Sequence, residues 1–440
     1  MLRAIQHTKV IRPQIINAKL MLCIAALSVA LPLACASDDK FAGNWVAAWS
    51  TSNMDIANPV MAGLMTGPHD FREFSNQTIR EIVHTTVAGS AARIRLANTF
   101  GGGPVTFDAI YIGKQNQGAS VLAGSNHAVT FGGAKSVAIP EGADALSDVI
   151  PQPTRAQQNV AISLYISKPT GPATFHASAF QTNYVSVEGN HAAEEGGEAF
   201  TKKSGSWFFL ASVEVLDAKQ TVGAIVALGD SITDGASSRP DANERWTDVL
   251  ARRLNGNSSQ PSFAVLNAGI GGNRVLSSSP CFGENALARL NRDVFAPAGV
   301  RSVILFEGTN DIGQPDTHAD AKYVPCLAKT HISADDLIAG YKQIIAQVHA
   351  RHLKIFGATI LPFKGFNGWT EKGEATRLEV NKWIKESRAF DGVIDFSAAL
   401  TDPVDPAKLA AKYDSGDHLH PGTEGHAAMA LAIDLSMFTK

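Results

Sequence analysis

Hydrophobic and polar positions follow two different patterns in the two parts of the chain. Before about residue 217, short runs of alternating apolar and polar residues recur between glycine-rich turns, at 78–87, 91–98, 105–112, 159–167 and 207–215. Alternation with a period of two is typical of strands that bury one face. Residues 37–217 are therefore predicted to form an all-β, sandwich-like domain.

From about residue 218 the pattern changes to continuous apolar runs that alternate with helical segments. The predicted strands cover residues 224–228, 263–266, 302–306, 355–361 and 393–396, and the predicted helices cover 244–254, 334–351, 371–387 and 424–438. Continuous apolar strands are typical of a parallel sheet that is covered on both faces. Residues 218–440 are predicted to be an α/β domain in which helices flank such a sheet.

Ser231 is the most informative polar residue because of its place after the first of these strands. It lies in Gly-Asp-Ser-Ile-Thr-Asp-Gly, residues 229–235, directly after the apolar run 224–228. Ligands of open α/β sheets bind at the carboxyl ends of the strands. Ser231 is therefore a candidate nucleophile, and the alternative is a turn that carries an ordinary serine.

A base for this serine is found near the C-terminus. Asp417 precedes His420 by three residues, a spacing that lets the carboxylate hold one ring nitrogen while the other takes a proton. A weak nucleophile such as a serine hydroxyl needs this kind of activation. Two alternatives stay open at this point: a solvated loop, and a metal site made of Asp417, His418 and His420.

Two further strand ends carry groups that stabilise an oxyanion. Asn-Ala-Gly-Ile-Gly-Gly-Asn, residues 267–273, offers backbone N–H groups, and Gly-Thr-Asn-Asp, residues 308–311, offers the amide of Asn310. Each cluster alone is also typical of an ordinary turn. Three successive strand ends with Ser, Gly and Asn favour a shared catalytic edge.

Taken together, these blocks resemble the SGNH (GDSL) hydrolases, a family of serine esterases and lipases, over residues 220–440. The resemblance implies a three-layer α/β/α, flavodoxin-like fold, with Ser231 as nucleophile, His420 as base and Asp417 as its orienting acid. It also implies an oxyanion hole formed by the N–H groups of Ser231 and Gly272 and the side chain of Asn310. Within the second block, Gly271 is the alternative to Gly272.

The α/β-hydrolase fold is the competing assignment for the same triad order. That fold presents its serine on a Gly-x-Ser-x-Gly turn. The chain contains no such pentapeptide, so the first resemblance is preferred.

Composition limits the possible partners. The 440 residues are 45% hydrophobic and 18% charged, with a formal net charge of -3. This charge gives no electrostatic signal for nucleic acid. No metal and no other cofactor is expected, and the predicted partner is a small-molecule, lipid or carbohydrate ester.

The N-terminus has the features of a leader. A basic region precedes 14 apolar residues at 20–33, and Ala-Cys-Ala at 34–36 resembles a cleavage site. A stable membrane span would require about 20 apolar residues. Residues 1–36 are therefore predicted to be a signal peptide of an exported protein, periplasmic or secreted; a lipoprotein acylated at Cys35 is the alternative.

Two cysteines remain after such a cleavage, Cys281 and Cys326. An even pair in an oxidising compartment predicts a disulfide. Free thiols are the alternative.

Aromatic residues suggest where substrate binds. Phe363, Phe366 and Trp369 follow the strand predicted at 355–361, where they would contact an acyl chain or a sugar ring. The alternative is that these rings pack their loop onto its own domain.

The sequence therefore predicts an exported, metal-independent carboxylic ester hydrolase that works through an acyl-enzyme and deacetylates carbohydrates. A lipase or lysophospholipase with the same site, an acyltransferase, and a carbohydrate-binding protein without catalysis are the alternatives.

Overall fold

The computed structural model describes residues 43–64, 71–216, 221–256 and 261–439, all within one compact unit. The predicted signal peptide, Cys35 and the domain boundary at 217 lie outside these residues. Below, residues 43–216 are called the β-rich segment and residues 221–439 the α/β segment.

Parallel strands form the centre of the α/β segment. Its five-stranded sheet has the order β17-β16-β18-β19-β20, with bounds Ser262–Gly269, Thr221–Gly229, Val300–Phe306, Lys354–Ala358 and Gly392–Ile394. Every neighbouring pair is parallel. In chain order this is 2-1-3-4-5, the flavodoxin-like arrangement. From β16 the chain goes first to β17 on one side of that strand and then to β18 on its other side. The order in which strands are added therefore changes direction at β16.

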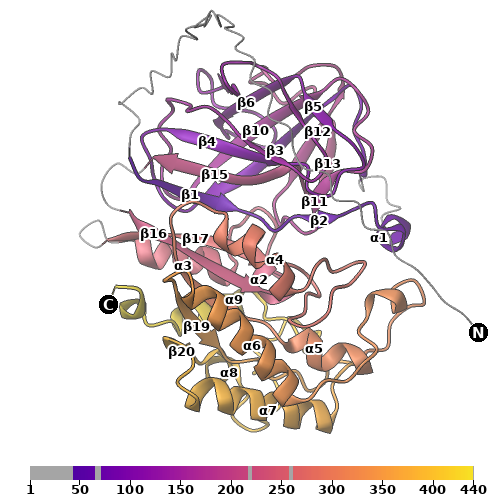
Figure 1. Cartoon of the computed structure of the whole chain (residues 1–440), viewed down its shortest axis with the longest axis vertical. Coiled ribbons are helices and arrows are strands. Elements are labelled where there is room, and N and C mark those ends of the chain that lie inside the picture. The colour runs from indigo at the N-terminus through magenta and orange to yellow at the C-terminus, as the bar shows by residue number, and fades with distance from the viewer. Residues whose placement is uncertain (1–42, 65–70, 217–220, 257–260, 440) are drawn as a thin grey trace, which may run out of the picture. The chain divides into compact units, whose positions relative to one another are not determined.

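Helices cover both faces of this sheet, as the continuous apolar strands require (Figure 1). In β16, Val226 and Leu228 pack toward α6 (Ala334–His349) and α7 (Glu371–Glu386). The alternate residues Ile225 and Ala227 belong to the opposite core. That core contains α3 (Trp246–Asn255), α8 (Phe396–Leu400) and α9 (Thr423–Leu431). The predicted three-layer α/β/α fold is confirmed.

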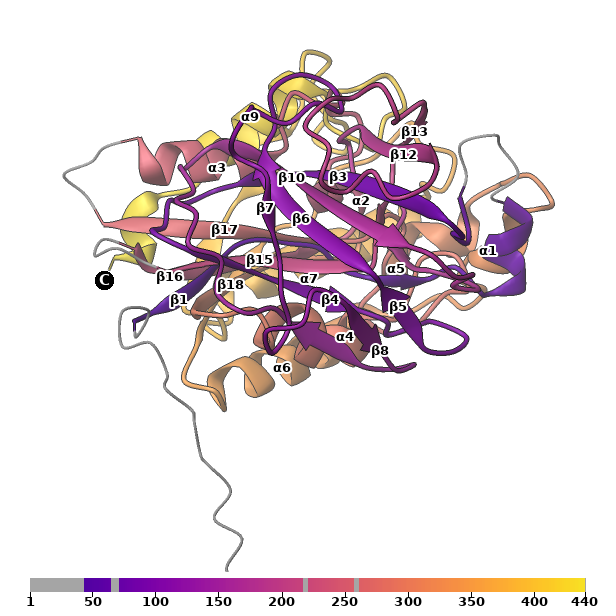
Figure 2. The same ribbon diagram turned by 90° about the horizontal axis from the view of Figure 1, so that it is seen from above.

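Antiparallel sheets make up the β-rich segment (Figure 2). One sheet has the order β1-β15-β4-β9, with bounds Trp45–Ser50, Leu210–Leu216, Ala92–Ala97 and Asp144–Leu146. The other has the order β13-β12-β3-β10-β6-β7, with bounds Lys202–Ser204, Asn183–Glu188, Gln77–Thr85, Gln158–Ile166, Ala109–Lys114 and His127–Ala128. Apolar side chains of both sheets share one core, which agrees with the predicted sandwich.

Two predicted strands of this segment are divided. The run 105–112 becomes β5 (Val105–Phe107) and β6, which pair in different sheets. The run 207–215 becomes β14 (Trp207–Phe208) and β15 because Phe209 has a positive φ of 57°. A left-handed residue cannot continue a strand, so hydrophobic alternation alone did not reveal this break.

The last predicted helix, 424–438, is also divided. Helix α9 ends at Leu431, and a separate 3-10 turn, Leu435–Phe438, begins after Asp434. Asp434 accepts the N–H of Ser436 and so caps the new turn.

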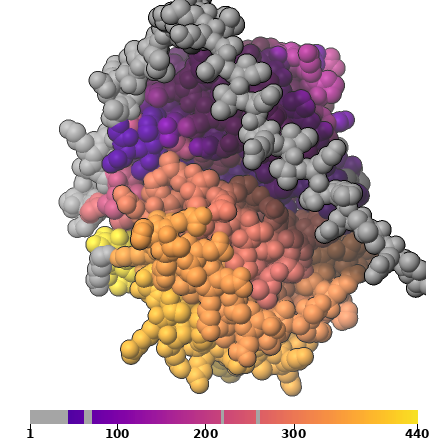
Figure 3. Space-filling view, viewed as in Figure 1, coloured from indigo at the N-terminus to yellow at the C-terminus, as the bar shows by residue number. Residues whose placement is uncertain are grey.

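The two segments lie directly against each other (Figure 3). They are joined by hydrogen bonds as well as by apolar packing. The N–H of Ala47 in β1 donates to the carbonyl of Ala298 at 2.9 Å. Thr86, just after β3, accepts the N–H of Val265 through its hydroxyl at 3.2 Å. Val265 belongs to the edge strand β17, so the β-rich segment satisfies a backbone donor of the parallel sheet.

Candidate active site

Ser231 lies at the carboxyl end of β16, where the strand gives way to a short helix. That helix, α2, spans Ser231–Asp234, and Asp230 caps it by accepting the N–H of Ile232 at 3.0 Å. The carboxyl ends of β17 and β18 flank this position. Ser231 therefore lies at the point where open α/β sheets bind ligands.

His420 reaches the hydroxyl of Ser231 from the loop before α9. Its Nε2 lies 2.8 Å from Ser231 Oγ, and its Nδ1 lies 2.6 Å from Asp417 Oδ2. The three residues, predicted from two separate motifs, are thus joined in one line of hydrogen bonds. This arrangement places a proton acceptor at a serine and a carboxylate behind the acceptor.

Asp417 is held rigidly by the loop that carries it. Its Oδ1 accepts the N–H of Leu419 at 2.9 Å and that of His420 at 2.8 Å. Burial alone would raise the pKa of Asp417, but the hydrogen bonds from His420 outweigh it and hold that pKa well below its usual range. Asp417 is consequently ionised at neutral pH and keeps a proton on His420 Nδ1.

The loop after β17 places Gly272 beside Ser231. Gly272 has a φ of +74°, and a Cβ there would lie 2.4 Å from the ring of Phe282. Its carbonyl accepts from Gln314 at 2.9 Å, and no acceptor among the described residues takes its N–H. The N–H of Gly271, by contrast, donates to Asp234 at 3.1 Å. The N–H of Gly272 is the one that remains available.

Asn310 projects from α5 (Thr309–Gly313), which begins just after β18. Its Nδ2 donates to Asp230 Oδ2 at 3.4 Å, which fixes the amide with its nitrogen toward the start of α2. Burial raises the pKa of Asp230 to about 6. Asp230 thus orients Asn310 and also caps the helix of the serine.

A cavity of about 210 Å³ opens at this site. Ser231, Gly272, Asn310 and His420 all line it. The rest of its wall is mainly apolar and includes Phe282, Leu327, Phe363, Phe366 and Leu419. The arrangement offers a nucleophile, a base and two kinds of N–H donor around one small space.

The three predicted aromatic contacts are placed differently. Phe363 and Phe366 line the cavity, Phe363 being almost fully buried. Trp369 does not line it but packs against the hydrophobic core of the α/β segment.

A disulfide joins Cys281 to Cys326, as predicted, with a Cα–Cα distance of 5.4 Å. The neighbours of the two cysteines, Phe282 and Leu327, both line the cavity. The bond therefore ties together two loops that form the wall of the site.

His418 does not join the line of hydrogen bonds between Ser231, His420 and Asp417. Its Nδ1 is bonded to Asp414 at 2.6 Å, so each histidine of this loop has its own carboxylate. Within the described ranges, no three His, Cys, Asp or Glu side chains gather in a way that would hold a metal ion. None of the helices in those ranges has the length and apolarity needed to cross a bilayer.

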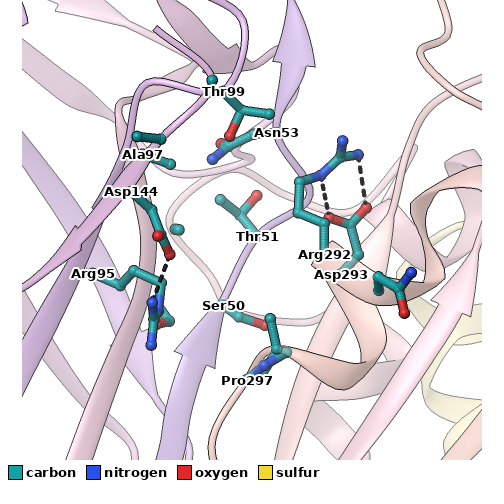
Figure 4. A pocket seen from close by; sticks show the side chains of 16 residues that line it. Ser50, Thr51, Asn53, Arg95, Ala97, Thr99, Asp144, Arg292, Asp293 and Pro297 are labelled. Atoms are coloured by element: carbon teal, nitrogen blue, oxygen red, sulfur yellow. Dashed lines mark hydrogen bonds and ion pairs between the residues drawn. The ribbon is translucent and has the colours of Figure 1, made fainter. Parts of the chain in front are cut away.

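A second, larger cavity of about 420 Å³ lies elsewhere, between the β-rich segment and the π-helical segment Leu290–Phe295 (Figure 4). The pair Arg95–Asp144 stands on one side of it and the pair Arg292–Asp293 on the other. Its lining includes none of the residues that line the first cavity. The larger of these two cavities is therefore not the one that contains Ser231 and His420.

Sequence reasoning missed several residues that shape the site. Asp234 was visible in the serine motif but had no assigned role. Gln314 begins a short 3-10 helix and Phe282 lies in a loop, and neither stretch has a recognisable pattern. His176, which contacts Asp234 from the β-rich segment, lies 58 residues away in the chain and gave no signal.

Residues 227–428 match the model of the GDSL-like Lipase/Acylhydrolase family. No curated protein sequence is similar enough to the chain to count as a match.

Several solved structures resemble part of the chain. The acetylxylan esterase Axe2 from Geobacillus stearothermophilus is 22% identical, with 48% of this chain and 93% of that chain covered and a TM-score of 0.36. The acetyl xylan esterase AlAXEase is 18% identical, with 48% and 96% covered and a TM-score of 0.35. The α/β hydrolase LAE5 from the metagenome of Lake Arreo, Spain, is 20% identical, with 48% and 94% covered and a TM-score of 0.36.

Proposed function

We propose that the protein is an exported serine esterase acting through Ser231, His420 and Asp417. The match of residues 227–428 to the GDSL-like lipase/acylhydrolase family supports its activity as a carboxylic ester hydrolase. The observation that carries this proposal is the 2.8 Å contact between Ser231 Oγ and His420 Nε2. The disulfide between Cys281 and Cys326 supports export, because such bonds persist in oxidising compartments.

In the first half of the reaction, Ser231 Oγ forms a bond to the ester carbonyl carbon while His420 Nε2 takes its proton. The negative charge on the carbonyl oxygen is met by the N–H groups of Ser231 and Gly272 and by Asn310 Nδ2. The bond to the alcohol then breaks, and His420 gives its proton to the leaving oxygen. Asp417 holds the imidazolium throughout.

In the second half, water replaces the alcohol. His420 takes a proton from the water as its oxygen bonds to the acyl carbon, and Ser231 leaves with that proton. The products are the free acid and the regenerated enzyme, so the cycle needs no other co-reactant.

The cavity supports a short acyl group. Its volume of about 210 Å³ is below the range of about 300–1,000 Å³ that is typical of drug-sized ligands. Acetyl and similar esters, including those on carbohydrates, fit this space better than long lipid chains. A rate profile over p-nitrophenyl esters from acetate to palmitate tests this, and a maximum at long chains would favour a lipase instead.

The decisive variants are Ser231→Ala and His420→Ala. Each should lower kcat on p-nitrophenyl acetate by at least about a thousandfold, because the members of a triad act as a unit. His418→Asn is the matched control, since His418 lies two residues from His420 but bonds Asp414. Asn tolerates the positive φ of 64° at this position, and this variant should keep most of the activity.

Labelling by a fluorophosphonate probe separates the esterase from a binding protein without catalysis. The wild-type protein should be labelled and Ser231→Ala should not. Equal labelling of both, or full activity of Ser231→Ala, would refute the proposed nucleophile. An alcohol acceptor that outcompetes water in the second half would indicate an acyltransferase.

A further inference from the structure

Asp234 connects the serine helix to the loop of the proposed oxyanion hole. It is the last residue of α2, three residues after Ser231, and it is buried. Its Oδ2 accepts the N–H of Gly271 at 3.1 Å. The next residue is Gly272, which lines the cavity. Movement of the Asp234 carboxylate would therefore shift Gly271 and, through it, the next peptide unit, which carries the Gly272 N–H.

His176 of the β-rich segment holds the other oxygen of this carboxylate. It ends β11 (Thr174–His176), is 2% exposed, and its Nε2 lies 3.0 Å from Asp234 Oδ1. Its Nδ1 lies 2.8 Å from the carbonyl oxygen of Ser52. A carbonyl oxygen only accepts, so Nδ1 carries a proton, and the carboxylate on the other side also requires one.

The ring is therefore doubly protonated and forms a charge-assisted hydrogen bond to Asp234. Burial alone would lower the pKa of His176, but the charge of Asp234 together with the hydrogen bonds to Asp234 and to the Ser52 carbonyl raises that pKa above its ordinary value. A buried ion pair contributes little net stability compared with apolar packing. Its directional bonds at both ends suit a role in orientation.

The backbone at Ser52 is itself fixed against the same loop. Ser52 Oγ accepts from Arg289 Nη1 at 3.1 Å. Arg289 is fully buried and also donates to the carbonyls of Ala268 and Gly229 and to Asn273 Oδ1, at 2.7, 3.1 and 3.0 Å. These three acceptors stand at the ends of β17 and β16 and in the turn after β17. Arg289 thus connects Ser52, a hydrogen-bond partner of His176, to the strand ends that carry the site.

We propose that His176 and Asp234 are positioning residues, through which the β-rich segment holds the loop 269–273 so that the Gly272 N–H faces the substrate carbonyl. The inference rests on the proposed function, because it assumes that Gly272 donates to the oxyanion. It gives the β-rich segment a part in transition-state stabilisation that does not involve touching the substrate.

His176→Ala and Asp234→Ala test the proposal with p-nitrophenyl acetate. Loss of an oxyanion donor costs about 10²–10³-fold in kcat, so a displaced donor should cost about tenfold to a hundredfold. KM should change less than about threefold, since the donor acts mainly in the transition state. The double variant should be no slower than the slower single variant, because both changes break one link.

Asp234→Asn is the conservative variant. Its Oδ1 can still accept the N–H of Gly271, and its Nδ2 can donate to a neutral His176. It should keep kcat within about threefold of the wild type. Affinity for a trifluoromethyl ketone, which mimics the tetrahedral intermediate, should fall across the series by the same factor as kcat/KM, a correlation that a purely structural role would not produce.

His84→Ala is the matched control. This histidine also belongs to the β-rich segment and lines a cavity together with His176 and Asp234, but it bonds Asn159 and Gln157 at 2.7 and 3.1 Å rather than Asp234, so its loss should leave kcat unchanged. If His176→Ala does not fold, His176→Gln carries the same expectation. Both partners of His176 are hydrogen-bond acceptors, and the single donor nitrogen of Gln cannot take the places of both ring nitrogens.

Two outcomes would overturn the inference. One is wild-type kcat in folded His176→Ala and Asp234→Ala; the other is a loss of kcat without weaker binding of the ketone. Ser231→Ala is measured in the same panel. Its inactivity beside a fully active His176→Ala would remove only the positioning role, whereas its activity would remove the proposed function itself.

Discussion

His426 is expected to make the protein lose stability in mild acid. This residue of α9 is fully buried, and its Nε2 lies 3.0 Å from the carbonyl oxygen of Ala236, which follows the serine helix. Its Nδ1 accepts the N–H of Trp246 at 3.3 Å. The ring is therefore neutral, with its proton on Nε2, and protonation of Nδ1 would break the second bond. Burial lowers the pKa of His426 to about 4.

The sign and size of the effect follow from this lowered pKa. The unfolded chain protonates His426 near pH 6.5, whereas the folded protein does so only near pH 4. Between these values the unfolded state binds more protons, so the free energy of unfolding falls as the pH falls. At about 1.4 kcal/mol per pKa unit, the loss reaches about 3 kcal/mol by pH 4.

Urea unfolding of the wild type and of His426→Gln, measured from pH 7.5 to pH 4.0, checks this magnitude. The Gln amide can donate to Ala236 and accept from Trp246, but it does not titrate. Burial raises the pKa values of Asp230 and Asp311 to about 6, and these acids add stability as the pH falls through that value. Their contribution is common to both proteins and cancels in the difference.

The stability advantage of the wild type over His426→Gln should therefore shrink by about 3 kcal/mol between pH 7 and pH 4. Two unfolding curves that stay parallel over this range would show that His426 does not titrate differently in the folded state. They would refute the assignment of a buried, neutral ring.

Three further predictions concern the wall of the site. Gly271→Ala has room for its Cβ, whereas Gly272→Ala meets an aromatic ring at 2.4 Å with a positive φ; steady-state kinetics should show near-normal kcat for the first and a loss of about tenfold or more for the second, and equal loss would contradict the choice of Gly272. Phe366→Ala should widen the cavity and raise the hexanoate-to-acetate rate ratio about tenfold; an unchanged ratio would place the acyl group elsewhere. Replacing Cys281 and Cys326 together by Ala should lower the free energy of unfolding by about 2–4 kcal/mol, and an unchanged urea midpoint would show that the bond adds no stability.

The local parts of the fold and site were predictable because each rests on a short stretch of chain. The place of Ser231 follows from the apolar strand directly before it. Asp417 lies three residues from His420, so their spacing alone brings the carboxylate and the imidazole together. The parallel sheet follows from the alternation of strands with helices, whereas its flavodoxin-like arrangement was implied only by the family resemblance. The choice between Gly271 and Gly272 was left open, because the sequence does not show which of two adjacent N–H groups is free.

The remaining features depend on contacts between distant residues. The bond from His176 to Asp234 links two segments that have no common pattern. The break at Phe209 needs a left-handed backbone that its apolar neighbours do not indicate. Trp369 looked equivalent to Phe366, and only the path of the loop directs one ring to the cavity and the other to the core.

The hydroxyl of Thr86 that accepts the N–H of Val265 has a consequence for protein engineering. Strand β17 has a parallel neighbour on one side only, and exposed strand edges template intermolecular pairing. A truncated α/β segment, expressed by itself, would present this edge to other copies of itself. The β-rich segment thus covers the edge of β17 and prevents this self-association. Shortened forms of the protein for biotechnology should therefore retain it.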